Sequence, residues 1–152
     1  MEKYIHYGHK KFDSRSFNSV RNTNYGKPTG GLWLSPESGR YTWKSLVEVE
    51  FNPKSYLKKV VDENIFFECE IKDTSNIYKI ETISDLEKLP RIDGHDIFFD
   101  FEKMVSELGI DGLRIDVSKD PELRSGLYFW DCNCLFIMNP DVVSPIEKID
   151  VC

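Results

Sequence analysis

The sequence predicts a single α+β domain with mixed or antiparallel sheets and a few short helices. Short apolar or alternating segments outnumber segments with helical periodicity, so about seven strands are expected. The chain of 152 residues fits one domain, spanning 1–152, because domains cluster at roughly 100–150 residues. Neither an internal repeat nor a linker interrupts this pattern. The composition is 40% hydrophobic and 13% aromatic, which excludes a disordered chain.

In the first half of the chain, strands are expected at residues 4–7, 32–35 and 47–51. Residues 4–7 are aromatic or β-branched and end at Gly8, as a strand followed by a turn would. Residues 9–29 are polar with few apolar side chains, which predicts a long loop of the kind that often carries function. Residues 41–46 are expected to form a short helix, whereas residues 54–61 fit a helix or a turn.

In the second half, strands are expected at residues 64–71, 77–80, 112–117, 127–138 and 146–149. Ser84 and Glu87 have the spacing of a capping box, with Ser84 as the N-cap of a short helix. Apolar side chains recur every three or four residues from 98 to 108, and Gly109 follows them. This pattern is typical of an amphipathic helix that ends at a glycine.

Charge is distributed unevenly along the chain and limits the classes of partner. The net charge is −6, but residues 1–44 carry eight Lys or Arg against three Asp or Glu. The total disfavours a generic nucleic-acid binder, although the basic first third could hold one phosphorylated ligand. Solvated charge on unrelated faces explains the same pattern equally well. No apolar run approaches membrane-spanning length and the N-terminus lacks a signal-peptide core, so we expect a cytoplasmic protein without a membrane partner.

The cysteines are expected to be reduced and structural. Cys132 and Cys134 lie two apart on an expected strand, so they share one face and fit a core position. A zinc site formed by this pair with His6 and His9 is an alternative. The spacing C-x-C departs from the common zinc-ligand spacing, so we expect no metal.

Strand alternation sorts the side chains that could carry chemistry. His6 and Gly8 share a face of the first strand, Trp33 and Ser35 a face of the second, and Asp131 and Asn133 a face of the late strand. We expect these polar sets to converge on one cleft. Glycines at 8, 30 and 31 would let a ligand approach the backbone closely.

Three segments carry a resemblance to the ADP-ribosyltransferase fold. They are Tyr4-Ile5-His6-Tyr7-Gly8, Gly30-Gly31-Leu32-Trp33-Leu34-Ser35-Pro36, and the segment from Trp130 to Pro140 with its Asn-Pro-Asp ending. Together they cover roughly 25 residues and leave the middle of the chain unmatched. The resemblance implies an NAD-dependent mono-ADP-ribosyltransferase that modifies a protein or nucleic-acid target.

The resemblance also implies roles for individual residues. Asp131 would be the catalytic acid that holds the nicotinamide ribose, and Trp33 a flat wall for the cationic nicotinamide ring. Ser35 could bond the ribose or the amide, and Lys27 or Arg21 could meet the pyrophosphate. The NAD-binding positions expected from the motifs and this chemistry are His6, Tyr7, Gly8, Lys27, Gly31, Leu32, Trp33, Ser35, Trp43 and Asn133.

One departure from the family pattern leaves alternatives open. Most active members place Glu at the acidic position, often with Glu or Gln two residues earlier, whereas this chain has Asp131 and Phe129. Small phage-encoded members, including one that inactivates a CRISPR complex, resemble this chain in size and in using Asp. An anti-defence or toxin role is therefore one expectation. The alternatives are an inactive binding module that acts through an acidic surface, and an NAD glycohydrolase.

Overall fold

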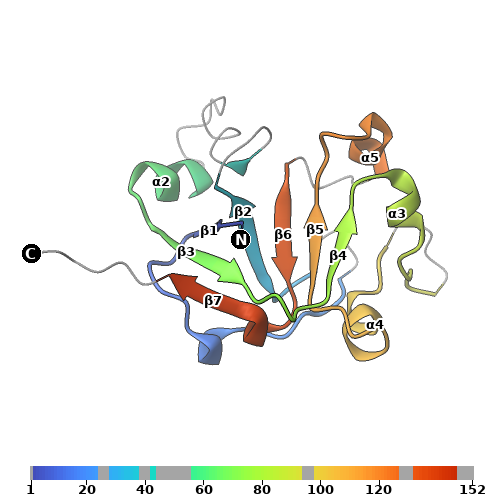
Figure 1. Ribbon diagram of the computed structural model, residues 1–152, viewed down its shortest axis with the longest axis horizontal. Helices are drawn as coiled ribbons and strands as arrows, with labels where there is room; N and C mark the ends of the chain where they lie inside the picture. The colour runs from blue at the N-terminus through green and yellow to red at the C-terminus, as the bar shows by residue number, and fades with distance from the viewer. Residues whose placement is uncertain are drawn as a thin grey trace, which may run out of the picture.

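The computed structural model describes residues 2–23, 28–37, 42–43, 56–93, 98–126 and 132–146. Within these ranges seven strands form one curled, mixed sheet in the order β4-β5-β6-β2-β1-β3-β7 (Figure 1). The strands are β1 (Tyr4–Tyr7), β2 (Leu32–Pro36), β3 (Phe66–Ile71), β4 (Ile77–Ile80), β5 (Gly112–Ile115), β6 (Cys134–Ile137) and β7 (Val143–Ile146). Strands β4 and β5 are parallel, and the other neighbouring pairs are antiparallel. With its short helices, this sheet confirms the α+β class.

Short helices connect the strands of the described chain. They are α2 (Tyr56–Asp62), α3 (Ile83–Glu87), α4 (Phe101–Ser106) and α5 (Pro121–Gly126), with 3-10 turns η1 (Ser14–Ser16) and η2 (Pro140–Val142). Helix α2 decides the open question at residues 54–61 in favour of a helix. Helix α5 was not expected, although Pro121 at its first position and the Asp120 side chain that accepts from Glu122 N are ordinary start signals.

Strand β2 joins the two halves of the sheet by changing its partner. Leu32, Trp33 and Leu34 pair with β6, whereas Ser35 and Pro36 pair with β1. Figure 1 shows β1, β3 and β7 running obliquely to the upright strands β2, β6, β5 and β4. The sheet therefore bends sharply at β2, and only two residue pairs hold β1 to β2.

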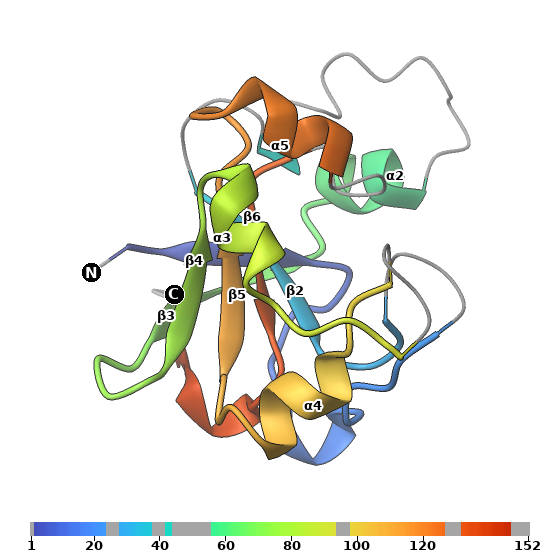
Figure 2. The ribbon, with the colours of Figure 1, turned by 90° about the vertical axis from the view of Figure 1, so that its right-hand side faces the viewer.

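The two faces of the sheet bury two separate cores, because alternate residues of each strand point to opposite faces. Helices α3, α4 and α5 lie along the β4-β5-β6 half, and their apolar side chains form the helix-side core (Figure 2). Its buried members are Val20, Ile80, Leu86, Leu89, Phe101, Met104, Ile110, Leu113, Ile115, Val117, Leu123, Cys134, Phe136 and Met138. The strand-side core on the opposite face contains Tyr4, Leu34, Phe67, Cys69, Leu135, Ile137, Val142 and Val143. All of β6 is buried between them.

The expected N-cap of α3 is wrong by two residues. Thr82, not Ser84, caps the helix: its hydroxyl accepts from Asp85 N at 3.2 Å. The Asp85 carboxylate reaches back to Thr82 N at 3.1 Å and completes the capping box. Asp85 therefore takes the place expected of Glu87. Both Thr82 and Ser84 suit an N-cap. Thr82 is the N-cap because β4 ends at Ile80 and the helix begins at Ile83.

We expect Thr82→Ala to lower the free energy of unfolding by about 1 kcal/mol, because the N–H of Asp85 loses its acceptor. Ser84→Ala is the matched control: Ser84 is exposed inside the helix, so its loss should change stability little. Urea denaturation of both variants measures the difference. An equal loss for the two variants would contradict this cap assignment.

Other boundaries also differ from the expectation. Strand β6 is described only from Cys134, and β7 begins at Val143, before the expected 146–149. Val105 and Leu108 of the expected amphipathic stripe are 38% and 50% exposed, because α4 is short and turns away after Ser106. The strand expected at 47–51, most of 41–46, and residues 127–131 and 147–149 lie outside the described residues.

Candidate functional site

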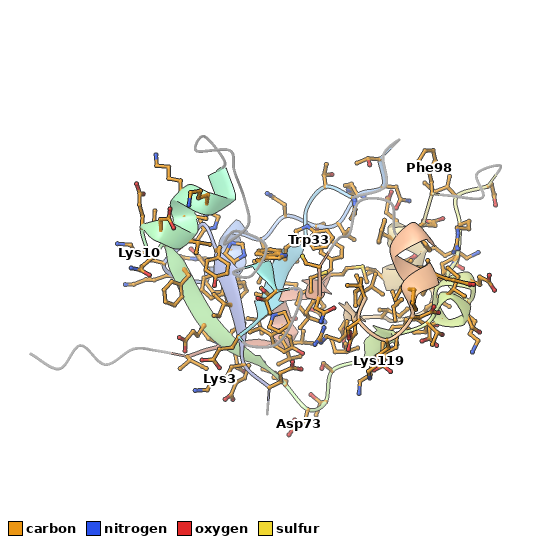
Figure 3. The ribbon with its side chains drawn as sticks, turned by 90° about the horizontal axis from the view of Figure 1, so that it is seen from above. Lys3, Lys10, Trp33, Asp73, Phe98 and Lys119 are labelled. Atoms are coloured by element: carbon orange, nitrogen blue, oxygen red, sulfur yellow. The ribbon has the colours of Figure 1, made fainter. Side chains whose placement is uncertain are left out.

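Three half-buried aromatic side chains and one buried hydroxyl gather where β2 changes its partner. We call Tyr7, Trp33, Ser35 and Trp43 the aromatic junction. Trp33 and Ser35 alternate on β2, and Ile5 lies directly opposite Ser35, so Ile5 and Tyr7 share their face of the sheet. Figure 3 shows Trp33 near the middle of the molecule, between Lys10 beside α2 and Phe98 at the far end.

Trp33 is held in place by the ring of Phe136 on β6. The two rings stack with centroids 4.3 Å apart, and the edge of Phe101 from α4 meets Phe136 from the helix-side core. Gly31 precedes this pair with φ +72°, and a Cβ there would lie 2.3 Å from the Phe136 ring. Only glycine therefore lets the Phe136 ring pack this closely against the chain that leads into β2.

Ser35 positions Trp43. Its side chain is 1% exposed, and its hydroxyl accepts from Trp43 N at 3.1 Å and donates to the Pro36 carbonyl at 3.3 Å. The Trp43 ring then lies 6.2 Å from the ring of Tyr7, and burial raises the pKa of the Tyr7 hydroxyl. The sequence suggests direct ligand contact for Ser35; in the structure its hydroxyl is buried and bonded to the backbone of Trp43 and Pro36.

His6 does not share the face of Trp33 and Ser35, contrary to the expected convergence. The register of β1 against β2 and β3 places His6 with Phe67, on the side of the strand-side core. Its Nδ1 bonds the Trp33 carbonyl at 2.9 Å and its Nε2 lies 3.0 Å from His9 Nδ1. Because both ring nitrogens are engaged, a bond from His6 to a ribose would have to displace one of these partners.

Three of the remaining expected residues are described, each in a different place. Leu32 packs against the strand-side core, on the opposite face from Trp33. Gly8 has φ +122° and donates from its N–H to the Ile65 carbonyl. Asn133 precedes β6 and accepts from Val117 N at 2.8 Å, so its amide oxygen fastens the chain after β5. Asp131 and Lys27 lie outside the described residues.

Asn22 is a positioning residue that the sequence did not reveal. Its side-chain oxygen accepts from Phe101 N at 2.8 Å, and its side-chain nitrogen donates to Asp100 at 2.8 Å. Its backbone N–H donates to Glu102, which also pairs with Arg21 at 3.3 Å. Asn22 therefore ties the loop before β2 to the start of α4. A single Asn in a polar loop gives no sequence signal for such a role.

The zinc alternative receives no support from the described positions. His6 and Cys134 face opposite sides of the sheet, and Cys69, Cys132 and Cys134 are buried. The described ranges contain no group of three or more His, Cys, Asp or Glu side chains placed to hold a metal. In the same ranges, none of the helices has the length and apolar character needed to cross a membrane.

Comparisons of this chain with protein-family models, with curated proteins and with solved structures found no match.

Proposed function

We propose that the protein is an NAD-dependent mono-ADP-ribosyltransferase that modifies a macromolecular target in an anti-defence or toxin role. The observation that carries the proposal is the aromatic junction at the bend of the sheet. Trp33, Tyr7 and Trp43 offer half-buried rings on one face, and β6 runs beside β2 there. In the sequence, Asp131 comes three residues before Cys134, the first residue of β6.

The chemistry of NAD calls for flat rings and a carboxylate. The nicotinamide ring is flat and cationic, and an indole such as Trp33 binds flat cations by dispersion and by its quadrupole. When the nicotinamide–ribose bond breaks, its electron pair leaves with nicotinamide and positive charge develops on the ribose. A carboxylate close to that ribose stabilises the charge, and this is the role we propose for Asp131. The acceptor then bonds the anomeric carbon and releases its proton.

The aromatic junction also explains how the site could remain rigid with few polar contacts. Trp33 is fixed by Phe136, and Trp43 is fixed through the buried Ser35 hydroxyl. Rings held by packing and by backbone bonds lose little entropy when a ligand binds. We therefore assign contact with the ligand to Tyr7, Trp33 and Trp43. Ser35 and Gly31 instead hold the aromatic rings in position.

A second candidate, an inactive binding module, is favoured by a separate observation. An open depression beside α4 is lined by four carboxylates, those of Asp93, Asp100, Glu102 and Glu107, against two cations, Arg91 and Lys103. Such a surface suits a basic partner. If the protein is this binding module, Asp93→Lys together with Glu107→Lys should abolish its binding to the basic partner. If it is the transferase, the same changes should leave its reaction with NAD unchanged.

The test follows the adenylate half of NAD. NAD labelled in the adenylate half is incubated with the protein in a cell lysate, and macromolecules are separated from small molecules. Label on a macromolecule supports the transferase. Label found only as free ADP-ribose indicates the glycohydrolase instead, and intact NAD in every fraction favours the binding module. A Trp33→Ala variant should lose transfer, whereas Phe12→Ala, which removes a ring that packs against Phe67 on the opposite face, should retain it.

A further inference from the structure

His6 and His9 form a hydrogen-bonded pair of imidazoles at the end of β1. His6 Nε2 and His9 Nδ1 are 3.0 Å apart, the ring centroids are 5.2 Å apart and the planes differ by 18°. The centroid separation exceeds the nitrogen separation by close to the diameter of one imidazole. The two nitrogens therefore lie on the line between nearly coplanar rings, which is the geometry of an in-line hydrogen bond.

The partners of each nitrogen fix where the hydrogens lie. The Trp33 carbonyl can only accept, so His6 Nδ1 carries a hydrogen and donates it at 2.9 Å. Neutral His6 then has a lone pair on Nε2, and His9 Nδ1 must be the donor to it. Both rings are thereby held as Nδ1–H tautomers. Two consecutive hydrogen bonds link His9 to His6 and His6 to the backbone of β2.

A metal ion does not fit between the rings in this arrangement. Imidazole nitrogens bind zinc at about 2.0–2.1 Å, so an in-line bridge needs nitrogens about 4 Å apart. The observed 3.0 Å leaves room only for a hydrogen. The two rings therefore share a hydrogen and do not bind a metal ion between them.

The backbone next to each histidine favours the hydrogen bond between the two rings. Gly8 has φ +122°, a conformation that side chains disfavour, and this conformation turns His9 back toward His6. On the other side, β1 pairs with β2 only at Tyr4 and Ile5. The His6 ring bonds the Trp33 carbonyl just beyond the last paired residue, so it continues the connection between the two strands.

We propose that His6 and His9 act as a pH-sensitive latch, which holds the end of β1 and its following loop against β2 until both rings are protonated. Protonating His9 at Nε2, the nitrogen that does not face His6, leaves both hydrogen bonds in place. When His9 is also protonated, protonating His6 places a hydrogen on Nε2 against the hydrogen of His9 Nδ1, and the bond between the rings is lost. The inference is independent of the proposed function, and its test measures no enzymatic activity.

The surroundings of His6 favour its neutral form. Burial lowers the pKa of His6 most, the Trp33 carbonyl raises it, and the charge of His9 lowers it again. The ring of Phe67 from β3 packs 5.0 Å away, Phe12 from the loop packs against Phe67, and neither is charged. Lys10 is exposed and is the charged side chain that follows His9 in the chain. Because the folded-state pKa lies below the usual 6.5, the latch is fully formed above about pH 6.5 and weakens as the pH falls below it.

Nuclear magnetic resonance of 15N-histidine protein tests the latch from about pH 8 to pH 5. His95→Gln is used as the background, so that only the signals of the pair remain. We expect both rings to carry hydrogen on Nδ1 at the higher pH. His9→Ala should move the His6 midpoint upward, because it removes both the hydrogen bond to the Nε2 lone pair and the charge of His9. The amide signals of Gly8 and Trp33 should change with the His6 step.

Lys10→Gln is the matched control, because it removes an exposed neighbouring charge without removing a ring, and it should leave the His6 midpoint nearly unchanged. An Nε2–H tautomer of neutral His6, or a His6 midpoint that ignores His9→Ala, would overturn the paired arrangement. Ring titration without any change at Gly8 and Trp33 would overturn the latch.

Discussion

Asp131→Ala is expected to reduce nicotinamide release from NAD by about 10²–10³-fold, the loss typical when one charge-stabilising group is removed from a transition state. The proposed role of the carboxylate is electrostatic, so the size of the side chain matters less than its charge. Asp131→Asn should therefore lose nearly as much activity as Asp131→Ala. Both variants should unfold at the temperature of the parent protein, measured by circular dichroism.

The matched control for this carboxylate is Asp73→Ala. Asp73 is exposed in the turn between β3 and β4, and Figure 3 shows it at the edge of the molecule, away from Trp33. Its removal should leave nicotinamide release unchanged. Full activity in Asp131→Ala would assign the charge-stabilising role to another residue.

Gly31→Ala should destabilise the protein by about 3 kcal/mol, and lower the melting temperature by roughly 6–12 °C. Two costs add at this position. An alanine at φ +72° costs about 1 kcal/mol, and its Cβ would lie 2.3–2.4 Å from the Phe136 ring, which is itself 0% exposed. The ring must move, and the stacking of Trp33 on Phe136 is lost with it. Thermal denaturation measures the loss.

Gly109→Ala separates the backbone contribution to the destabilisation from the steric one. Gly109 has φ +61°, but a Cβ there would meet nothing within 4 Å, so only the backbone cost of about 1 kcal/mol is expected. In a Phe136→Leu background, Gly31→Ala should destabilise the protein less than in the parent, because the clashing ring atoms are gone and only the Ile137 carbonyl oxygen, 3.0 Å from the added Cβ, remains close. An equal loss for Gly31→Ala in both backgrounds would contradict the packing explanation.

The sheet was largely predictable because its strands have strong local patterns. Residues 4–7, 32–35 and 77–80 carry β-branched or aromatic side chains bounded by turns, and each is a strand. Strand ends and caps were less predictable: Thr82 and Ser84 have nearly equal capping chemistry, and the end of β4 decides between them. The short helix α5 has too few residues to show a period.

The face of His6 could not be predicted from alternation alone. Alternation correctly divided β1 into two sets, Ile5 with Tyr7 and Tyr4 with His6. Which set meets Trp33 depends on the register between β1 and β2, and a shift of one residue would exchange the sets. The polar character of His6 favoured the wrong set, whereas the pairing of Ile5 with Ser35 brings Tyr7 to the aromatic junction. Long-range contacts such as those of Asn22 have no local signal.

Release of nicotinamide tests the central claim most directly. Purified protein is mixed with NAD, alone and then with a cell lysate, and free nicotinamide is followed by NMR spectroscopy. The proposed transferase predicts release that depends on both the protein and the lysate and that falls in Asp131→Ala. Absence of release under both conditions, with no shift of the melting temperature by NAD, would contradict the account and favour the binding module.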